Sequence, residues 1–582
     1  MSGLFLYVCA FFFYAMRKYI LIIFASICVL PIFGQTPAKY WVQFKDKAQS
    51  SYSVSRPEEF LSLQAIALRQ QHNIAIDETD LPVNESYIRQ VLALDDSMRL
   101  LTRSKWLNGI TVYSQRGDIL IRIRRLPCVA FAEKTIALGT SETDLDTVFK
   151  YESNETIHHT YASDVKRKKD FSYGDSEMQL RMTNIHWLHR MGYRGEGIRL
   201  MVLDGGFSRA NTLNFFQTLR NDGRLLGVRN LVQCGKSPFQ TGTHGTTVLS
   251  CIAAYEPKKI VGSAPMVQVY LCQTEDGRTE HKIEEDNWVA GLEWADSLGC
   301  QVLNSSLGYT KFDDSTQIRV CEHLTGNVSR ASRAATMASA KGMLICNSAG
   351  NEGAKEWRHI GCPADAQGIL TVGAVTNKQN RAIFSSYGPT ADGRIKPDVC
   401  ALGQMTAVAG LNGKPHVASG TSFSSPLMAG MAACLWQAFP EKSNTEIMDA
   451  IRQSATQAAC PDSLLGYGIP DFLRAYNILK QPKDCPDDIS FNSFVATNDT
   501  LYIGISDNVI TDVVSRCVVT IPNNPKAKVK SIENGSRPNE DGSICYHYKI
   551  VLPKFKKKHS YKLTEIEINH FGVLKRFMIG QE

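Results

Sequence analysis

Short, continuous apolar runs separated by helix-like segments are the feature that most constrains the fold of this chain. The clearest runs lie at residues 198–203, 267–271, 302–305, 343–347 and 369–375. Strands of a parallel sheet are buried on both faces, so they read as uninterrupted apolar stretches. Between the runs, apolar residues recur with helical spacing. This alternation predicts an α/β domain over residues 173–480 with a doubly wound, mostly parallel sheet.

Further domains are expected on both sides of this unit, because 582 residues are too many for one ordinary core. Residues 36–139 alternate strand and helix patterns, with a capping-box spacing at 55–58, which predicts an α+β sandwich of ferredoxin-like type. Residues 106–113 read as one of its strands. Residues 481–582 alternate or run β-branched between Asn, Gly and Pro, which predicts a small C-terminal β-sandwich. The polar segment 140–172 is expected to be a linker that contains a processing region.

The N-terminus has the layout of an export signal. A basic pair at residues 17–18 precedes an apolar run over residues 19–33. Such an arrangement is typical of a secretory signal peptide, here residues 1–35. The apolar stretch before the basic pair favours Met16 as the true start. We therefore expect a protein that is secreted or held in the periplasm or cell envelope, with no membrane span once the signal is removed.

Charge and composition exclude some classes of function. The chain is 43% hydrophobic and 21% charged, as soluble globular proteins are, and its net charge of +7 is mild. Its basic clusters, mainly residues 166–169 and 554–558, lack the interleaved aromatic residues of a nucleic-acid platform. No Cys or His spacing typical of a metal site occurs. We expect a monomer with no nucleic-acid partner and no cofactor.

Ser422 stands just before an apolar segment that runs from Leu427 to Phe439. Gly420 permits a tight turn and Pro426 suits the first turn of a helix, which predicts Ser422 at a helix N-terminus. Free N–H groups and the helix dipole favour negative charge there, as a serine that attacks a carbonyl requires. A serine that merely caps a buried helix is the alternative.

Asp204, His244 and Asn351 supply the partners that a nucleophilic serine needs. Asp204 follows the first apolar run, His244 opens an apolar helix, and Asn351 follows the run at 343–347. In this reading His244 takes and returns the proton, Asp204 orients the imidazole, and Asn351 donates to the oxyanion beside the Ser422 N–H. Each residue alone has a structural alternative: a turn aspartate, a helix-start histidine or a loop-capping asparagine. Together the four favour catalysis.

With these residues, the chain resembles the subtilisin-like serine peptidases (subtilases) over residues 173–480. The order Asp, His, Ser separates it from the α/β-hydrolases, whose order is Ser, acid, His. Its details are most similar to the secreted subtilases of Bacteroidetes-type bacteria. The stretches that carry the likeness are Asp204–Gly206, His244–Thr246, Ser305–Gly308, Ala349–Asn351, Gly420–Ser422 with Pro426, Phe384–Pro389 and Lys396–Val399.

The resemblance implies a secreted serine endopeptidase that cleaves protein or peptide substrates through an acyl-enzyme. It implies a triad of Asp204, His244 and Ser422, with Asn351 in the oxyanion hole. Two classes of alternative stay open: a secreted esterase or other acyl hydrolase on the same fold, and a binding protein built on an inactive protease fold. Gly205 stands where the family usually has Ser or Thr, which predicts a looser setting for the aspartate.

The resemblance also implies how substrate, propeptide and metal ions are bound. Substrate is expected to pair with the backbone of one wall of the cleft and to meet a second loop. Residues 36–139 are expected to be a propeptide that assists folding and inhibits until cleaved, with a permanent accessory domain as the alternative. Family members often bind structural calcium, but no carboxylate cluster here is specific enough to assign. The residues of the two cleft segments are Ser306, Leu307 and Gly308, and Ala349 and Gly350.

Overall fold

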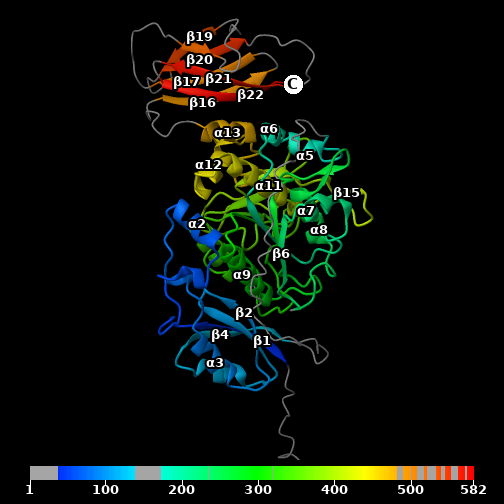
Figure 1. Ribbon diagram of the computed structural model, residues 1–582, viewed down its shortest axis with the longest axis vertical. Helices are drawn as coiled ribbons and strands as arrows, with labels where there is room; N and C mark the ends of the chain where they lie inside the picture. The colour runs from blue at the N-terminus through cyan, green and yellow to red at the C-terminus, as the bar shows by residue number, and fades with distance from the viewer. Residues whose placement is uncertain are drawn as a thin grey trace, which may run out of the picture.

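The computed structural model describes residues 37–137, residues 172–480 apart from 234 and 318, and the strands that lie between residues 489 and 581. In those last strands, side chains are described only at Glu565, Glu567, Arg576 and Met578. The predicted signal peptide and nearly all of the predicted linker therefore lie outside the described residues. Figure 1 shows three bodies along the long axis, in chain order from the blue N-terminal domain to the orange and red C-terminal strands.

The N-terminal domain is an antiparallel four-stranded sheet in the order β2-β3-β1-β4. Two helices, α3 and α4, connect its strands in the ferredoxin-like arrangement that the sequence predicted. Its elements are β1 (Ala38–Phe44), α3 (Glu85–Leu92), β2 (Arg99–Ser104), β3 (Gly109–Ser114), α4 (Ile119–Arg124) and β4 (Val129–Ala137). An inserted segment between β1 and α3 carries η1 (Pro57–Glu59), α2 (Leu63–Gln71) and η2 (Glu78–Asp80), and Figure 1 shows α2 beside the central domain.

The first long helix of this domain begins later than the capping-box spacing at residues 55–58 predicted. That spacing produces only the single turn η1, and α2 begins after Ser62, whose side chain accepts a hydrogen bond from the Ala65 N–H. The Ser62 N–H donates to the Ser297 carbonyl of the central domain, 2.9 Å away. A contact to a distant segment therefore fixes this helix start, and a local pattern does not reveal such a contact.

The strand predicted at residues 106–113 was also too long. β3 begins at Gly109, and Trp106 and Leu107 lie in the turn that follows β2. Both side chains are buried in a hydrophobic cluster of the central domain that includes Trp288. The apolar pattern at these positions therefore marks an interface between the domains.

The central domain is built on a parallel seven-stranded sheet in the order β13-β12-β11-β10-β5-β9-β6. The chain enters the sheet at β5, and later strands add on both sides, so the sheet is doubly wound as predicted. Its strands are β5 (Arg199–Asp204), β6 (Leu225–Asn230), β9 (Gln268–Gln273), β10 (Val302–Ser305), β11 (Leu344–Ser348), β12 (Leu370–Val375) and β13 (Val399–Leu402).

Helices cover both faces of this sheet, and alternate strand residues point to the two layers. In β5, Leu200 and Val202 join the cluster that contains α8 and α11, while Met201 and Leu203 join the cluster with α9 and α10. None of the helices in the described ranges is long and apolar enough to cross a membrane. The helices are α5 (Glu177–Arg181), α6 (Ile185–Met191), α7 (Gln217–Asn221), α8 (His244–Ala253), α9 (Lys282–Ser297), α10 (Arg330–Ala340), α11 (Thr421–Ala438), α12 (Asn444–Ser454) and α13 (Phe472–Leu479).

Two short helical turns and two hairpins complete the central domain: η3 (Asn214–Phe216) and η4 (Cys321–His323), the pair β7 (Tyr255–Glu256) and β8 (Ile260–Val261), and the pair β14 (Thr406–Ala409) and β15 (Pro415–Ala418). The C-terminal strands form the predicted small sandwich, with sheets in the orders β16-β17-β20-β19 and β18-β21-β22. They are β16 (Ile489–Thr497), β17 (Thr500–Asp507), β18 (Cys517–Thr520), β19 (Ile532–Pro538), β20 (Ile544–Val551), β21 (Lys562–His570) and β22 (Val573–Gln581).

Asp398, just before β13, is the centre of a buried ion cluster in the central domain. Its carboxylate lies 2.7 Å from Lys396 Nζ and 2.9 Å from Arg452 Nη2, and it accepts the Thr371 N–H at 2.8 Å. The neighbouring cations lower the pKa of Asp398 against the opposing effect of burial. Arg452 also pairs with Asp449 at 3.0 Å, but the Asp449 side chain is 59% exposed.

Replacing Asp398 by alanine is expected to lower the free energy of unfolding by about 3–5 kcal/mol, because it leaves the buried Lys396 and the partly buried Arg452 without their shared anion. Asp449→Ala, which removes an exposed partner of the same arginine, is expected to cost about 0–1 kcal/mol. Urea unfolding followed by circular dichroism compares the two. Equal shifts of the unfolding midpoint in the two variants would show that the buried ion cluster stabilises the fold no more than the exposed ion pair does.

Candidate active site

The predicted site residues gather at the carboxyl edge of the parallel sheet. Asp204 is the last residue of β5, and the segments that carry Ser306 and Asn351 follow β10 and β11 directly. These strands are neighbours in the sheet, and all run in the same direction. Residues far apart in the sequence therefore lie at one edge of the sheet, the edge at which open α/β sheets bind ligands.

Asp204 and His244 are in direct contact. His244 Nδ1 lies 2.9 Å and 3.1 Å from the two carboxylate oxygens of Asp204, which is fully buried. His244 is the first residue of α8, and the start of this helix packs closely against the loop after β5. A Cβ on Gly245 would lie only 2.5 Å from the Gly206 carbonyl oxygen. The glycine at 245 thus lets α8 bring the imidazole to the carboxylate.

Gly205 does not leave Asp204 without support. The Gly205 N–H donates to Asp204 Oδ1 at 2.8 Å, so a backbone group holds the carboxylate at the position where the family usually has a hydroxyl. Any residue other than proline at 205 could donate this N–H, so the predicted looser setting of the aspartate stays a prediction. The outer side of the imidazole remains open, because the His244 side chain is 42% exposed and has the Phe423 ring beside it at 6.0 Å between centroids.

The charge of Asp204 raises the pKa of His244 above its ordinary 6.5, while burial acts in the opposite direction. A second carboxyl group, Glu275, is buried close to Asp204. Burial raises the pKa of Glu275 to about 7, and the charge of Asp204 adds to this rise. Glu275 Oε1 accepts hydrogen bonds from the Tyr309 hydroxyl at 2.7 Å and the Thr274 hydroxyl at 2.9 Å.

Ser422 lies in the first turn of α11, and 8% of it is exposed. Its hydroxyl lies 3.5 Å from the Ser306 carbonyl, and within the described part of the chain no hydrogen bond joins it to His244. The helix begins at Thr421, so Pro426 lies in the second turn and the prediction of a first-turn proline was wrong. Gly420 adopts φ +157° just before the helix, as its predicted turn requires.

Pro426 leaves one carbonyl of this helix without its usual donor. A residue at this position would donate its N–H to the carbonyl four residues earlier, that of Ser422, and proline has no N–H. The Ser306 hydroxyl donates to that carbonyl instead, at 2.9 Å. Asn304 completes the link, since its Nδ2 lies 3.2 Å from Ser306 Oγ and its Oδ1 accepts the Ser425 hydroxyl at 2.9 Å.

Asn351 holds the other side of the same turn. Its Oδ1 accepts the Thr421 N–H at 2.9 Å and the Thr421 hydroxyl at 3.0 Å, and the Gly350 N–H donates to that hydroxyl at 3.1 Å. These bonds use the oxygen of the carboxamide. The amide nitrogen of this exposed side chain has no acceptor among the described residues and is the end that a ligand can reach.

The predicted cleft residues differ in how accessible they are. Ser306 is buried, Leu307 is partly buried and Gly308 is exposed, so this segment turns outward to the surface along its length. Gly350 is partly exposed at φ +108°. Ala349 is buried in a small hydrophobic cluster, and its side chain supports the loop from behind.

Sequence reasoning missed Thr421, Asn304 and Glu275 as parts of this site. Thr421 and Asn304 lie directly beside predicted residues, so their small polar side chains at a strand end and a helix start were the available signal. Glu275 gave no local signal, because its closeness to Asp204 depends on the pairing of β5 with β9. Among the described residues, no group of three or more His, Cys, Asp or Glu side chains is arranged to hold a metal ion, so calcium binding stays a prediction without a site.

Comparison with known proteins identifies the central domain. Residues 196–468 match the model of the subtilase family. This domain belongs to the subtilase family. Residues 39–147 match the model of the peptidase S8 propeptide domain of Bacteroidota. The chain is thus a serine-type endopeptidase, and the subtilase resemblance of the sequence is confirmed.

Curated relatives agree with this assignment. The chain is 28% identical over 354 residues to a thermostable alkaline protease of Halalkalibacterium halodurans, which covers 58% of the chain and 88% of the relative. It is 28% identical over 322 residues to subtilisin NAT of Bacillus subtilis subsp. natto, and the match covers 55% of the chain and 73% of the relative.

Among solved structures, the MycP3 protease from the type VII (ESX-3) secretion system is 18% identical with a TM-score of 0.41, over 52% of this chain and 89% of that chain.

Removing the Ser306 hydroxyl is expected to destabilise the subtilase domain by about 1–3 kcal/mol and to lower kcat, because Ser306→Ala leaves the buried Ser422 carbonyl without a donor. Pro426→Ala restores an N–H to that carbonyl. In the Ser306→Ala background it is therefore expected to recover both quantities, whereas in the unaltered chain it gives no such gain. Peptide hydrolysis and urea unfolding of the two single variants and the double variant measure the coupling. Strictly additive effects would contradict this account of the first turn of α11.

Proposed function

We propose that the chain is made as an exported precursor and hydrolyses peptide bonds through an acyl-enzyme in which Ser422 is the nucleophile. The observation that carries this proposal is the His244–Asp204 contact at the same sheet edge as a serine in the first turn of a helix. The helix N-terminus favours the oxyanion that forms on attack. The match to the subtilase family supports the same chemistry.

In the proposed mechanism, His244 accepts the proton of Ser422 as its oxygen attacks the scissile carbonyl. Asp204 orients the imidazole through Nδ1 and stabilises its positive charge, and His244 then returns the proton to the leaving amine. The Ser422 N–H and the amide nitrogen of Asn351 stabilise the oxyanion. Water then attacks the acyl-enzyme. His244 accepts a proton from this water and gives it to the oxygen of Ser422 as the acyl group leaves.

The substrate is proposed to lie as an added strand along residues 306–308. Gly308 is exposed, and among the described residues its backbone has no hydrogen-bond partner. An extended peptide can use such groups, while the loop at Gly350 borders the other side. The His244 side chain is 42% exposed, and its ring centroid lies 6.0 Å from that of Phe423, the residue after Ser422.

The N-terminal domain is proposed to act as an intramolecular inhibitor and folding aid. Its match to a propeptide domain supports this role, as does its contact with α9. Glu293 of α9 accepts hydrogen bonds from the Ser104 hydroxyl at 2.6 Å, the Lys105 N–H at 2.7 Å and the Trp106 N–H at 3.2 Å. Thr111 donates to Asp286 of the same helix at 2.9 Å. Cleavage is proposed in the linker that follows this domain, and secretion rests on the export signal and the propeptide match.

A fluorophosphonate probe tests the proposed nucleophile. In the processed protein, the probe is expected to modify Ser422 alone, since it reacts only with a serine that a base activates. The modified peptide is mapped by mass spectrometry. Ser422→Ala should abolish labelling, whereas Ser419→Ala, at an exposed serine of the same stretch, should leave it unchanged. Unlabelled processed protein would overturn the proposed triad.

The pH dependence of kcat/KM tests the role of His244. Only the neutral imidazole can accept a proton, so activity is expected to fall as the pH drops through the raised pKa of His244, above 6.5. Asp204→Asn removes the main cause of that rise, so the acid limb should move to lower pH while kcat falls by about 10⁴-fold. Asp392→Asn, at a partly exposed loop position, serves as the control. An acid limb that does not move in Asp204→Asn would contradict the assignment.

A further inference from the structure

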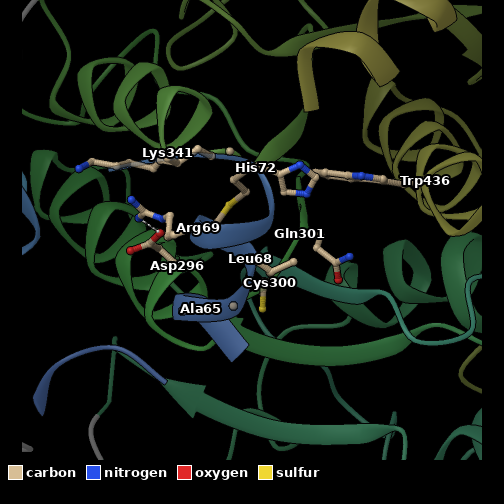
Figure 2. Close-up of a pocket in the computed structure, with 13 residues that line it drawn as sticks. Ala65, Leu68, Arg69, His72, Asp296, Cys300, Gln301, Lys341 and Trp436 are labelled. Atoms are coloured by element: carbon tan, nitrogen blue, oxygen red, sulfur yellow. Dashed lines mark hydrogen bonds and ion pairs between the residues drawn. The ribbon is translucent and has the colours of Figure 1, made fainter. Parts of the chain in front are cut away.

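Buried carboxyl groups have different partners at the two ends of α9. Near the C-terminus of this helix, Asp296 lies 2.6 Å from Arg69 and 2.7 Å from Lys105, and Figure 2 shows Arg69 and Asp296 facing each other. Near its N-terminus, Glu275 and Glu284 are only 8% and 2% exposed, and among the described residues no cation pairs with either. A buried carboxyl group without a cation needs hydrogen-bond donors to offset the loss of water.

The acidic groups at the N-terminal end of α9 also act on one another. Burial raises the pKa of Glu284 to about 9 and that of Glu280 to about 8, and the charge of Glu275 adds to both rises. Asp313 adds to the rise of Glu280, and Asp204 adds to that of Glu275, whose pKa is about 7. Glu280 and Glu284 therefore keep their protons at neutral pH, and the partner that Glu275 uses is a hydroxyl donor.

That donor is Tyr309, the residue that follows the predicted substrate-binding segment 306–308. Its hydroxyl donates to Glu275 Oε1 at 2.7 Å and lies 3.3 Å from the Glu284 carbonyl oxygen. The tyrosine is 1% exposed, and its ring belongs to the hydrophobic cluster that contains α9 and α10. Its N–H donates to the Cys362 carbonyl at 2.7 Å. The end of the segment is thus held at two points, one on the backbone and one on the side chain.

Glu275 is itself fixed beside the triad acid. The Thr274 N–H donates to the Asp204 carbonyl at 3.0 Å, and the Thr274 hydroxyl donates to Glu275 Oε1 at 2.9 Å. A Cβ on Gly205, the residue after Asp204, would lie 3.6 Å from the Glu275 Cβ. The carboxyl group of Glu275 therefore joins the ends of β5 and β9 to the side chain that ends the segment 306–308.

From these contacts we infer that Glu275 is a positioning residue, which fixes the substrate-binding segment relative to the catalytic pair through the Tyr309 hydroxyl. Gly308 is exposed and has no side chain to hold it, so its neighbour supplies the anchor. Because Glu275 lies against the residue after Asp204, the anchor refers the segment to the same strand end that carries the triad acid. The inference rests on the proposed function of residues 306–308.

The length of the substrate distinguishes this role from a general effect on the fold. Glu275→Leu leaves the Tyr309 hydroxyl only the more distant Glu284 carbonyl, so kcat/KM of the processed protein for an extended peptide is expected to fall about tenfold. Hydrolysis of a small ester that does not reach residues 306–308 is expected to change less than about twofold. Glu275→Gln keeps an acceptor oxygen and is expected to remain within about threefold of the parent on both substrates.

The donor is tested in the same way. Tyr309→Phe is expected to lower kcat/KM for the extended peptide about threefold to tenfold, and the double variant with Glu275→Leu is expected to lose less than the product of the two single losses. Tyr173→Phe is the matched control, because it removes another buried tyrosine hydroxyl of the same domain, one that lies 2.9 Å from His189 Nδ1. It is expected to change neither substrate more than about twofold.

Two further measurements separate positioning of the substrate from an effect on the triad. Since Asp204 is the main cause of the raised pKa of His244, Glu275→Leu should leave the acid limb of kcat/KM and the rate of fluorophosphonate labelling of Ser422 unchanged. A shifted acid limb, slower labelling, equal losses on peptide and ester, or equal losses in Glu275→Leu and Glu275→Gln would overturn the inference.

The labelling also separates this inference from the proposed function. A parent protein that is not labelled would refute the proposed nucleophile, and the inference would fall with it. A labelled parent whose peptide hydrolysis is unaffected by Glu275→Leu would overturn the inference alone.

Discussion

The first turn of α11 is held from both sides, and the whole candidate site depends on that hold. The loop after β10 fixes the Ser422 carbonyl through Ser306, and the loop after β11 fixes Thr421 through Asn351. Both loops emerge from parallel strands that are buried on both faces. The rigidity of the sheet is therefore passed to the helix start, and no strong single interaction is needed to place the serine. Proline at 426 makes this arrangement necessary, because it removes the donor that an ordinary helix would supply.

The fold could be predicted from the sequence where local pattern and tertiary structure agree. Runs such as residues 302–305 become β10 without a change of boundary, because a strand buried on both faces shows an unbroken apolar run. The start of α2 could not be predicted, since the N–H of its cap residue Ser62 bonds to the Ser297 carbonyl, which is far away in the sequence. The strand predicted at residues 106–113 was too long for a related reason. The apolar side chain of Trp106 packs in a hydrophobic cluster of the central domain and does not belong to a strand.

The candidate site shows the same division. The sequence singled out Asp204, His244, Asn351 and Ser422 as candidates, because the proposed chemistry limits which residue types can stand at strand ends and helix starts. The acid Glu275 was not found, because its neighbourhood is created by the pairing of β5 and β9. Burial there raises its pKa to about 7, which disfavours a second negative charge beside Asp204. This effect of Glu275 on the charge near Asp204 arises only when the strands pair, so no local sequence pattern predicts it.

The inserted segment of the N-terminal domain, residues 57–80, is called the arm here, and its contacts join parts of the chain that are far apart in the sequence. These contacts have a consequence for the order in which the molecule assembles. Arg69 and Asp296 are 227 residues apart, and Gln71 and Pro440 are 369 apart. These contacts close very long loops, so they can form only when most of the chain has emerged during synthesis. The residues of α2 are synthesised early, but the bond from the Ser62 N–H to the Ser297 carbonyl also waits for the central domain. The arm is thus made early and docks late, and contacts of such high sequence separation are the kind that slow folding.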